Sequence, residues 1–469
     1  MQTRRDQLHA YRFLTRRALA SLVTGEPNVV EPPMRRLTLT TVSGIMIAVL
    51  IAAVYTLFGV IKPSTGNTWK AAGTIIVERE TGARYVLIDN VLHPVLNYSS
   101  AVLALSGQQS THVTLVSQSD LSSTKRGATI GIDGIPDSLP SASNLLRSNW
   151  TVCSRQLAGN AGALDAQVTV QVGHAPAASA VPAGGAVLVR APSAASTYLL
   201  WHGERLGIAS QEVATALGLQ SVAALTVGTA FLDSLPQGST LRTPTVPGLG
   251  QPVATIAGQR SVVGQLIKVS DNGQLFVVLR DGIAPVNALQ ADLLQTLTLG
   301  RNRHLPQLST TADVELGIAQ SKSDVGALIA QFGGLPTAVP TVEPKAAQNG
   351  GLCAGFGTGG APAILTVPAS TLPATPGTTV EESVQSQRGI ADQVQLRPGQ
   401  AALVRSADGS PTVFVVAEPG KKYPAASVQV LSGFGYGNSN PLTLPGQLLS
   451  LIPTGPALDP DAARRPVTQ

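Results

Sequence analysis

The chain has 469 residues, more than one hydrophobic core usually serves, so we expect two or more domains. Only 13% of the residues are charged and 4% are aromatic, while 47 are glycine and 33 are proline, a composition that disfavours long helices and favours short strands and turns. Most of the net charge of +5 arises in residues 1–36, where seven arginines outnumber three acids, so we expect no nucleic-acid partner.

Residues 1–36 contain apolar side chains at spacings of three and four with arginines beside them, which predicts a short basic amphipathic helix. The apolar positions are Leu8, Tyr11, Leu14, Ala18 and Leu22. Such a helix either docks a partner protein or lies on anionic lipid, and the sequence leaves both interpretations open. The candidate docking residues are Leu8, Tyr11, Arg12, Leu14, Arg16 and Arg17.

Residues 37–61 form a run of 25 residues without a charge, between Arg35-Arg36 and Lys62. About 20 apolar residues suffice for a membrane-spanning helix, so we predict a single transmembrane helix here. The run follows a tail of 36 residues, which is not the position of a cleaved signal peptide. By the positive-inside rule, the arginine-rich tail is cytoplasmic and the chain after residue 61 lies outside the cytoplasm.

Four copies of one unit emerge when the region after this helix is compared with itself. Each copy has a short apolar strand, a turn, a strand led by an aromatic residue, a second turn, a third strand and a brief amphipathic helix. The first strands are residues 74–78, 186–190, 265–269 and 401–405, and the aromatic residues are Tyr85, Tyr198, Phe276 and Phe414. Because the copies start at irregular intervals, they do not form a simple solenoid.

The stretch "YLLWHGERLGIAS" (198–210) concentrates a Trp, a His, a Glu and an Arg between apolar runs, as an active site or a hairpin turn would. In the repeat frame, His202, Glu204 and Arg205 lie at or just after the second turn. The other copies lack this combination at the same place. We therefore interpret the stretch as a solvated turn.

The two cysteines, Cys153 and Cys353, lie in the insertions between repeats. An even pair outside the cytoplasm indicates one disulfide, which would join the insertions into a central module. The predicted fold class is therefore α+β, mostly β. It has one N-terminal transmembrane helix and then an elongated region of four small strand-rich repeats around a disulfide-linked central module.

The predicted organisation follows the chain. It comprises a cytoplasmic tail (1–36), the transmembrane helix (37–61), repeat 1 (62–106), the first part of the central module (107–181), repeat 2 (182–240), a linker with repeat 3 (241–297), the second part of the central module (298–396), repeat 4 with an apolar closing segment (397–457) and a disordered tail (458–469). The closing segment "LPGQLLSLIPTG" (444–455) either packs on the first repeat or a neighbouring molecule, or belongs to an ordinary core.

No motif supplies a catalytic set. The stretch "GGLCAGFGTGG" (350–360) imitates a nucleophile elbow and a phosphate loop, but the strand-like residues after it fit neither, so we interpret it as half of a disulfide in a tight loop. The six histidines have no metal-ligand spacing. Paired acids such as Glu381-Glu382 lie in polar loop sequence. The sequence thus supports neither a metal site nor acid–base catalysis.

Five features, taken together, are specific. They are "RRDQLHAYRFLTRRALASLV" (4–23), the single membrane helix, "GIPDSLP" leading to "WTVCS" (150–154), "GGLCAGF" (350–356) and "LPGQLLSLIPTGPALDPDAARR" (444–465). In these features nearly the whole chain resembles the EccB family of the type VII (ESX) secretion systems of mycobacteria and related actinobacteria. The resemblance implies a periplasmic region of four β-rich repeats around a central module whose disulfide falls on Cys153 and Cys353.

The resemblance also implies a location and partners. The protein would be a single-pass protein of the inner (plasma) membrane with a cytoplasmic N-terminus and a periplasmic C-terminal domain. Its partners would be the motor ATPase EccC, the membrane proteins EccD and EccE, the mycosin protease nearby, membrane lipid, and further copies of the chain as a dimer or higher oligomer.

The resemblance carries a label as an ATPase. ATP hydrolysis needs a phosphate cradle, Mg²⁺ ligands and a positioned water, and none has a recognisable counterpart in this sequence. We therefore expect no enzymatic activity and no cofactor, unless the family label applies, in which case the cofactor is ATP.

Three functional hypotheses follow. The leading one is a non-catalytic assembly component of the secretion complex, which docks partners through its N-terminal helix and oligomerises through its periplasmic domain. The second is an ATP-hydrolysing subunit of the same machine. The third is a periplasmic cell-wall-binding module, in which Trp150, Trp201 and Tyr436 stack on sugars.

Overall fold

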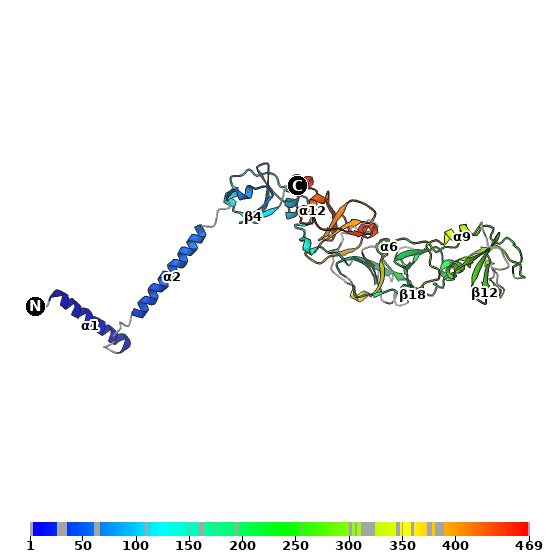
Figure 1. The fold of residues 1–469 in the computed structure, drawn as a ribbon, viewed down its shortest axis with the longest axis horizontal. Coiled ribbons are helices and arrows are strands. Elements are labelled where there is room, and N and C mark those ends of the chain that lie inside the picture. Colours follow the sequence, from blue (N-terminus) through cyan, green and yellow to red (C-terminus); the bar gives the residue numbers. More distant parts are fainter. Residues whose placement is uncertain are drawn as a thin grey trace. The chain divides into compact units, whose positions relative to one another are not determined.

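The computed structural model describes residues 3–25, 35–60, 66–107, 111–148, 150–158, 164–174, 176–192, 196–256, 258–299, 303–304, 307–310, 324–343, 348, 350–357, 361–372, 378–379 and 389–467. The chain divides into two compact units, Met1–Ala71 and Ala72–Gln469. The first unit contains helices α1 (Arg4–Thr24) and α2 (Arg35–Val60) and a short 3₁₀ helix, η1 (Gly66–Lys70) (Figure 1).

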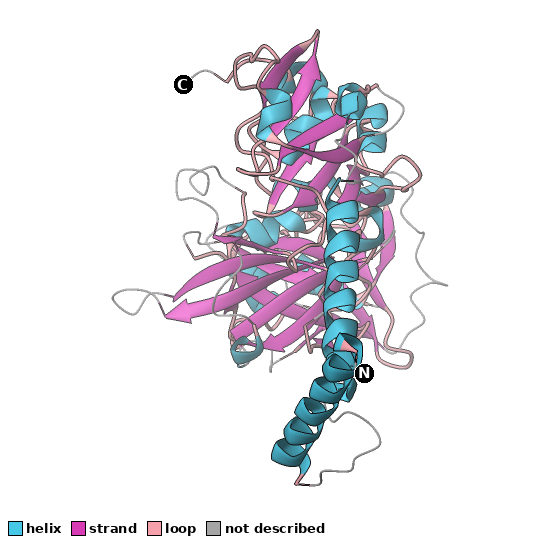
Figure 2. Cartoon of the chain, turned by 90° about the vertical axis from the view of Figure 1, so that its left-hand side faces the viewer, coloured by secondary structure: helices cyan, strands magenta, loops and turns pink. Residues whose placement is uncertain are grey.

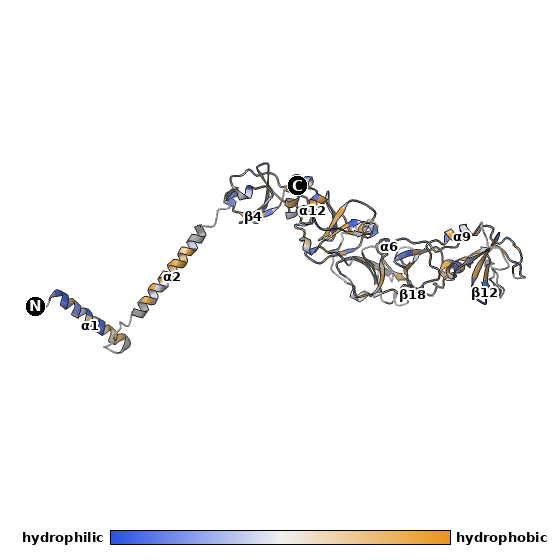
Figure 3. Cartoon of the chain, viewed as in Figure 1, coloured by the Kyte–Doolittle hydropathy of each residue, from blue (hydrophilic) through white to orange (hydrophobic). Residues whose placement is uncertain are grey.

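Helix α2 contains residues 37–60 of the predicted membrane span, and residue 61 lies outside the described residues. Its segment Leu39–Thr56 has a mean hydropathy of 2.0, and none of it is buried inside the structure. Figure 3 shows the middle of the same helix mostly in the hydrophobic colours. Helix α2 is therefore long and apolar enough to cross a membrane.

Strands dominate the second unit (Figure 2), and four of its sheets share one topology. Repeat 1 consists of β1 (Thr74–Glu78), β2 (Arg84–Ile88), β3 (Val91–Pro94), α3 (Tyr98–Ala104) and β4 (His112–Val116). Repeat 2 consists of β8 (Gly185–Arg190), β9 (Thr197–Trp201), β10 (Glu204–Ile208), α5 (Gln211–Ala216) and β11 (Leu225–Thr226). Repeat 3 consists of β12 (Leu266–Val269), β13 (Leu275–Leu279), β14 (Gly282–Val286), α7 (Ala288–Leu294) and β17 (Leu308–Thr310). Repeat 4 consists of β23 (Ala402–Ser406), β24 (Val413–Ala417), β25 (Lys421–Pro424), α12 (Val428–Gly433) and β26 (Leu442–Leu444).

The predicted aromatic residue occupies the same register position in every repeat. Tyr85 lies opposite Ile76 on the first strand and Pro94 on the third. The equivalent sets are Tyr198 with Val189 and Gly207, Phe276 with Ile267 and Pro285, and Phe414 with Val404 and Pro424. The three strands and the helix predicted for each copy are thus confirmed, and each first strand starts within one residue of its predicted position.

Each repeat also has a fourth strand, which the sequence analysis did not predict. This strand returns parallel to the first, so that β4 pairs with β1 and β26 pairs with β23. Residues 112–116 and 308–310 fall within the predicted central module, whereas the structure places them in the sheets of repeats 1 and 3. The apolar pattern of these residues predicts a strand but does not say which strand it pairs with.

A covering segment follows the fourth strand in repeats 1, 2 and 4, after the short helices α4 (Gln118–Leu121), α6 (Thr229–Ser234) and α13 (Gly446–Ser450). It runs beside the outer edge of the third strand through two parallel bridges. These bridges are Leu92↔Arg126 and Val95↔Ile130, Arg205↔Gln237 and Ile208↔Leu241, and Lys422↔Thr454 and Ala425↔Leu458. From the first strand to the second bridge, the three repeats span 74–130, 185–241 and 402–458, which is 57 residues in each.

A seven-stranded central sheet draws on both insertions, as the sequence analysis expected. Its strands, in spatial order, are β21 (Thr378–Thr379), β22 (Gln393–Gln395), β6 (Leu164–Val172), β5 (Trp150–Ala158), β19 (Gly350–Phe356), β20 (Ala363–Pro368) and β7 (Ser179–Ala180). The remaining elements are η2 (Ala142–Asn144), β15 (Thr298–Leu299), β16 (Arg303–His304), α9 (Asp324–Gln331), β18 (Thr341–Val342), η4 (Ala369–Thr371) and α14 (Pro460–Ala463).

The sheets of repeats 2 and 4 each separate two cores. In β8, Val187 packs in the core around the central sheet, whereas the next residue, Leu188, packs in a core shared with repeat 3. In β23, Val404 packs toward the central sheet and Leu403 packs in a core shared with repeat 1. Repeats 2 and 4 therefore contact the central sheet, and repeats 3 and 1 pack on their outer faces. Figure 1 shows the C-terminal repeat beside the first repeat.

The apolar closing segment belongs to an ordinary core. Leu448, Leu451 and Ile452 are buried in the core around the central sheet, where α13 packs against α6 of repeat 2. Of the interpretations left open for residues 444–455, the structure thus confirms ordinary core.

The predicted disorder of residues 458–469 is wrong for the described part of this tail. Leu458 and Ala463 are fully buried, and α14 packs against α3 of repeat 1. Arg464 Nε donates to the carbonyl oxygen of Ala104 at 2.8 Å, and the N–H of Val467 donates to Thr129 at 2.9 Å. The tail was predicted to be disordered because its composition is mostly polar. Its buried side chains, Leu458 and Ala463, do not stand out in such a sequence.

Candidate functional site

The disulfide lies at the middle of the central sheet. Cys153 on β5 and Cys353 on β19 are directly opposite each other in an antiparallel pair, with their Cα atoms 4.0 Å apart. Both are buried, beside Val367 and Leu372. The bridge closes a sequence separation of 200 residues, which stabilises the fold by at most about 5 kcal/mol in the chain-entropy model. The predicted link between the two insertions is present.

The glycines around Cys353 serve strand packing. Residues 350–356 form β19, so the expected tight loop is wrong and the stretch is extended. A Cβ on Gly351 would lie 2.5 Å from the carbonyl oxygen of Val367 on the neighbouring strand, so only glycine fits there. This close approach, and not a phosphate or a nucleophile, accounts for the glycine.

The stretch around His202 is the tight turn between β9 and β10. His202 and Gly203 have φ angles of 49° and 78°, the left-handed values that a two-residue hairpin turn requires. His202 Nε2 lies 2.7 Å from the carbonyl oxygen of Ala183, and Arg205 forms an ion pair with Asp233 at 2.9 Å. These side chains hold the hairpin in place, which confirms the interpretation as a turn.

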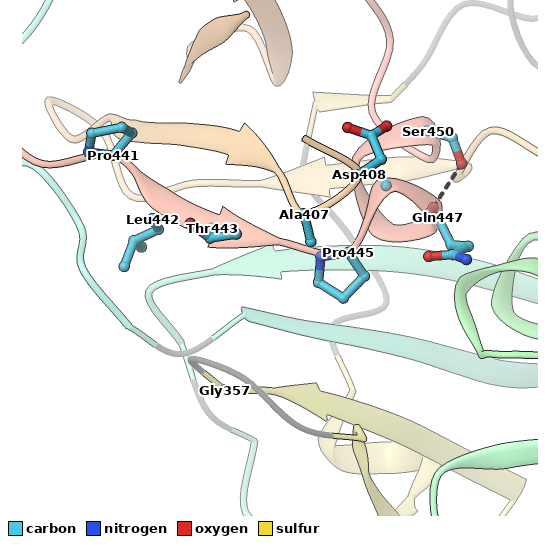
Figure 4. Close-up of a pocket in the computed structure, with 10 residues that line it drawn as sticks. Gly357, Ala407, Asp408, Pro441, Leu442, Thr443, Pro445, Gln447 and Ser450 are labelled. Carbon is cyan, nitrogen blue, oxygen red and sulfur yellow. Dashed lines mark hydrogen bonds between the residues drawn. The ribbon is translucent and has the colours of Figure 1, made fainter. Parts of the chain in front are cut away.

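Two depressions lie beside β26, and the described lining of neither forms a cradle for a triphosphate. One of about 880 Å³ lies beside β26 (Figure 4). Among its described lining residues, Asp408 is the one ionisable group, and the N–H of Ser410 and the hydroxyl of Ser406 hold the pKa of its carboxyl below the ordinary value. A charged carboxylate repels phosphate oxygens. The described lining of this depression therefore does not fit ATP.

The neighbouring depression, of about 550 Å³, has Arg405 in its lining. The Nε of Arg405 donates to Thr443 Oγ1 at 3.0 Å, across the parallel pair of β23 and β26. Within the part of the chain that the structure describes, no three His, Cys, Asp or Glu side chains gather at metal-binding distance. Arg405 thus has no described set of Mg²⁺ ligands beside it.

Two of the three aromatic residues proposed to stack on sugars are buried. Trp150 and Tyr436 are each 1% exposed, inside separate cores. Trp201 is half-buried, and its ring stacks on His202 at 3.9 Å between centroids. The assignment of Trp150 and Tyr436 as sugar contacts is wrong, because their rings fill cores.

Lys422 is a partly buried cation that the sequence analysis did not single out. Its Nζ donates to the carbonyl oxygen of Leu449, at the end of α13, and lies 5.9 Å from the centre of the Phe414 ring. Burial lowers the pKa of Lys422 to about 8. No local signal in the sequence distinguishes it from its neighbour Lys421.

The candidate docking residues lie on α1. The apolar side chains among them are exposed in the described structure, Leu14 by 64% and Tyr11 by 70%. Asp6 accepts a hydrogen bond from the N–H of Thr3 at 3.2 Å and closes the first turn of the helix. The predicted helix is present over Arg4–Thr24, and what its apolar residues contact stays a prediction.

The long apolar helix, the four repeats and the disulfide-linked sheet define a membrane-anchored repeat protein. Residues 1–467 match the family model described as type VII secretion system ESX-1, transport TM domain B, and the chain belongs to this family. The resemblance to EccB is thereby confirmed.

Individual relatives agree over nearly the full length. The ESX-3 secretion system ATPase EccB3 of Mycobacterium tuberculosis is 27% identical over 491 residues, which cover 97% of this chain and 88% of the relative. A chain of an intact ESX-5 inner membrane complex has the same fold, with a TM-score of 0.65 and 24% identity, over 100% of this chain and 96% of the other. The EccB3 dimer from the ESX-3 core complex gives a TM-score of 0.62 and 25% identity, over 83% and 99%.

Proposed function

We propose that this protein is a structural subunit of an inner-membrane type VII secretion complex, anchored by α2, with its repeats in the periplasm and α1 in the cytoplasm. The observation that carries the proposal is the use of the repeats for packing. The described cores join repeat to repeat and repeat to central sheet. The family membership and the relatives found in ESX membrane complexes support it.

In this proposal, α1 docks a cytoplasmic partner through its apolar side. By similarity to the family, the partners are the motor ATPase EccC and the membrane proteins EccD and EccE, with the mycosin protease on the periplasmic side. The seven arginines of residues 1–36 keep this end in the cytoplasm.

A pair of variants on α1 tests the docking. Leu14 and Phe13 are equally exposed, at 64%, but consecutive residues are about 100° apart around a helix, so Phe13 lies outside the stripe that contains Leu14. Leu14→Glu should reduce co-purification of the membrane partners with the full-length chain at least tenfold, while Phe13→Glu should leave it unchanged. If α1 lies on lipid instead, Leu14→Glu leaves the co-purified partners unchanged and weakens only the binding of α1 to anionic vesicles.

ATP hydrolysis is the alternative, and the names of the curated relatives favour it. The depression beside β26 does not favour ATP hydrolysis, because the ionisable group in its described lining is the carboxylate of Asp408. The test is ATP turnover by the purified full-length chain against a mock purification. Turnover that follows the folded chain through gel filtration would overturn the purely structural function, and turnover equal to the mock preparation would support it.

A further inference from the structure

Strand β4 is the outer strand of the sheet of repeat 1, which is ordered β3-β2-β1-β4. The N–H of His112 donates to Gly73, and the carbonyl oxygen of Val116 accepts from Arg79. In a parallel pair, every second residue of a strand bonds to the same neighbour. Residues 112, 114 and 116 therefore bond toward β1, and the backbone groups of Val113 and Leu115 point away from it.

The side chains of the same two residues are exposed, Val113 by 51% and Leu115 by 55%. The strand His112–Val116 contains no charged residue and no proline, the usual protections of a sheet edge. At the opposite edge of this sheet, β3 has Pro94 and is covered through the bridges to Arg126 and Ile130. Among the described strands of repeat 1, β4 is thus the edge suited to pairing with a further strand.

We propose that β4 pairs antiparallel with β4 of a second copy of this chain, about a two-fold axis through Thr114. In this register Val113 lies opposite Leu115 of the second copy, and Leu115 lies opposite its Val113. The outward N–H and C=O groups of both residues then exchange four hydrogen bonds across the axis. The two four-stranded sheets become one sheet of eight strands.

A second copy fits because the strand complements itself in this register. Each valine packs beside a leucine on the same face, an apolar cross-strand pair that stabilises a sheet. The flanking residues Thr111 and Ser117 lie opposite each other, so no like charges meet. A related EccB3 chain forms a dimer in the ESX-3 core complex.

Pairing of one five-residue strand buries much less than the roughly 1,200–2,000 Å² of a stable interface. It therefore acts between copies that the membrane and the secretion complex already hold close together. The proposed pairing thus rests on the proposed assembly function, and β4 is one surface through which the assembled copies would contact each other.

The test is disulfide cross-linking of the full-length chain in its membrane. The sequence contains only Cys153 and Cys353, which are bonded to each other, so an introduced thiol has no other cysteine in the chain to pair with. Thr114→Cys places two thiols on the two-fold axis at a non-hydrogen-bonded position, where Cα atoms are about 4.5 Å apart, within disulfide reach. Mild oxidation should convert most of this variant to a covalent dimer.

Two variants control for register and for collision. Val113→Cys has its copy on the diagonal, about 7–8 Å away, and should cross-link at least tenfold less. Ile329→Cys lies on α9 with 56% exposure, close to that of Leu115, and should not cross-link. Adding Leu115→Lys to Thr114→Cys should reduce the dimer at least tenfold, whereas adding Ile329→Lys should not.

Equal cross-linking of all three cysteine variants, or a product that joins Thr114→Cys to a different protein, would overturn the pairing. The pairing would also be overturned if Thr114→Cys gave no covalent dimer while still co-purifying with the secretion partners. That result would leave the assembly function intact. A wild-type chain that fails to co-purify with any membrane partner would instead refute the assembly function itself.

Discussion

At the scale of single residues, the hairpins of repeats 1 and 2 depend on left-handed backbone conformations. Asp89 and Asn90 have φ angles of 48° and 62° between β2 and β3, and His202 and Gly203 occupy the equivalent turn of repeat 2. Asn and Asp tolerate this region better than other side chains, which explains why polar residues recur there without a shared chemistry.

Gly203 carries a second constraint, because a Cβ there would lie 2.3 Å from the carbonyl oxygen of Pro362. Gly218 has a similar φ of 69° but open space around it. Gly218→Ala should lower the free energy of unfolding by about 1–2 kcal/mol, the cost of a left-handed alanine. Gly203→Ala should lower it by at least about 1 kcal/mol more, because backbone must move. Urea unfolding of the two full-length variants in detergent measures both changes in the free energy of unfolding. Equal changes would contradict the prediction, because they would mean that the backbone at Pro362 moves aside without cost.

Lys422 should make stability depend on pH. Burial lowers its pKa from 10.5 to about 8. Between these pH values the unfolded chain binds more protons than the folded chain, so the free energy of unfolding rises with pH. Lys422→Met removes the titrating amine, and the difference in unfolding free energy, wild type minus variant, should rise from pH 8 to pH 10. Lys421→Met controls for the lost charge, and a flat difference for Lys422→Met would contradict the prediction.

At the scale of elements, local signals were sufficient for three strands of each repeat. The apolar run 74–78 and Tyr85 lie within a dozen residues and share one hairpin, so their pattern predicts both strands and their pairing. The partner of β4 lies farther away in the sequence, since Thr74 pairs with His112 and helix α3 lies between them in the chain. Pattern alone does not assign such a non-local parallel pair.

For the candidate site, the disulfide was predicted correctly and two of the proposed sugar contacts were not. Compartment and cysteine count predicted the bond between Cys153 and Cys353, which needs no local motif. Trp150 and Tyr436 were wrong as sugar contacts because an aromatic residue looks the same in the sequence whether its ring fills a core or faces solvent.

Helix α14 should hold repeat 1 against repeat 4. A chain that ends at residue 457 lacks Leu458, Ala463 and the hydrogen bond from Arg464 to the end of α3. Its amide exchange in α3 (Tyr98–Ala104) should rise at least tenfold, because a buried helix loses its cover. Exchange in α5 (Gln211–Ala216) of repeat 2 should not change. A similar rise in both helices would mean that the truncation destabilises the fold generally.

At the scale of the whole second unit, the shared cores couple the repeats. The core around the central sheet includes Leu200 of repeat 2, Val404 of repeat 4 and Val152 of the sheet itself. In a linear repeat array each unit contacts only its neighbours and unfolding proceeds in steps. Here the central sheet makes repeats 2 and 4 interdependent although they are far apart in sequence.

Repeats 2 and 4 should therefore unfold with the central sheet in one transition. Hydrogen exchange under increasing urea should expose β8, β23 and β5 at the same denaturant concentration. Loss of protection in β23 at a clearly lower concentration than in β5 would show that repeat 4 is an independent unit.

The arrangement of repeat 1 determines how the chain bears tension. A pull transmitted along the polypeptide from α2 reaches the second unit at β1, an inner strand bonded to β2 on one side and to parallel β4 on the other. Drawn along its own axis, such a strand is loaded in shear, so its hydrogen bonds must break together and not one after another. The C-terminal tail, bonded at Ala104 and Thr129, braces the same repeat. The first strand after α2 in the chain is thus bonded on both sides, within a repeat that the C-terminal tail also holds.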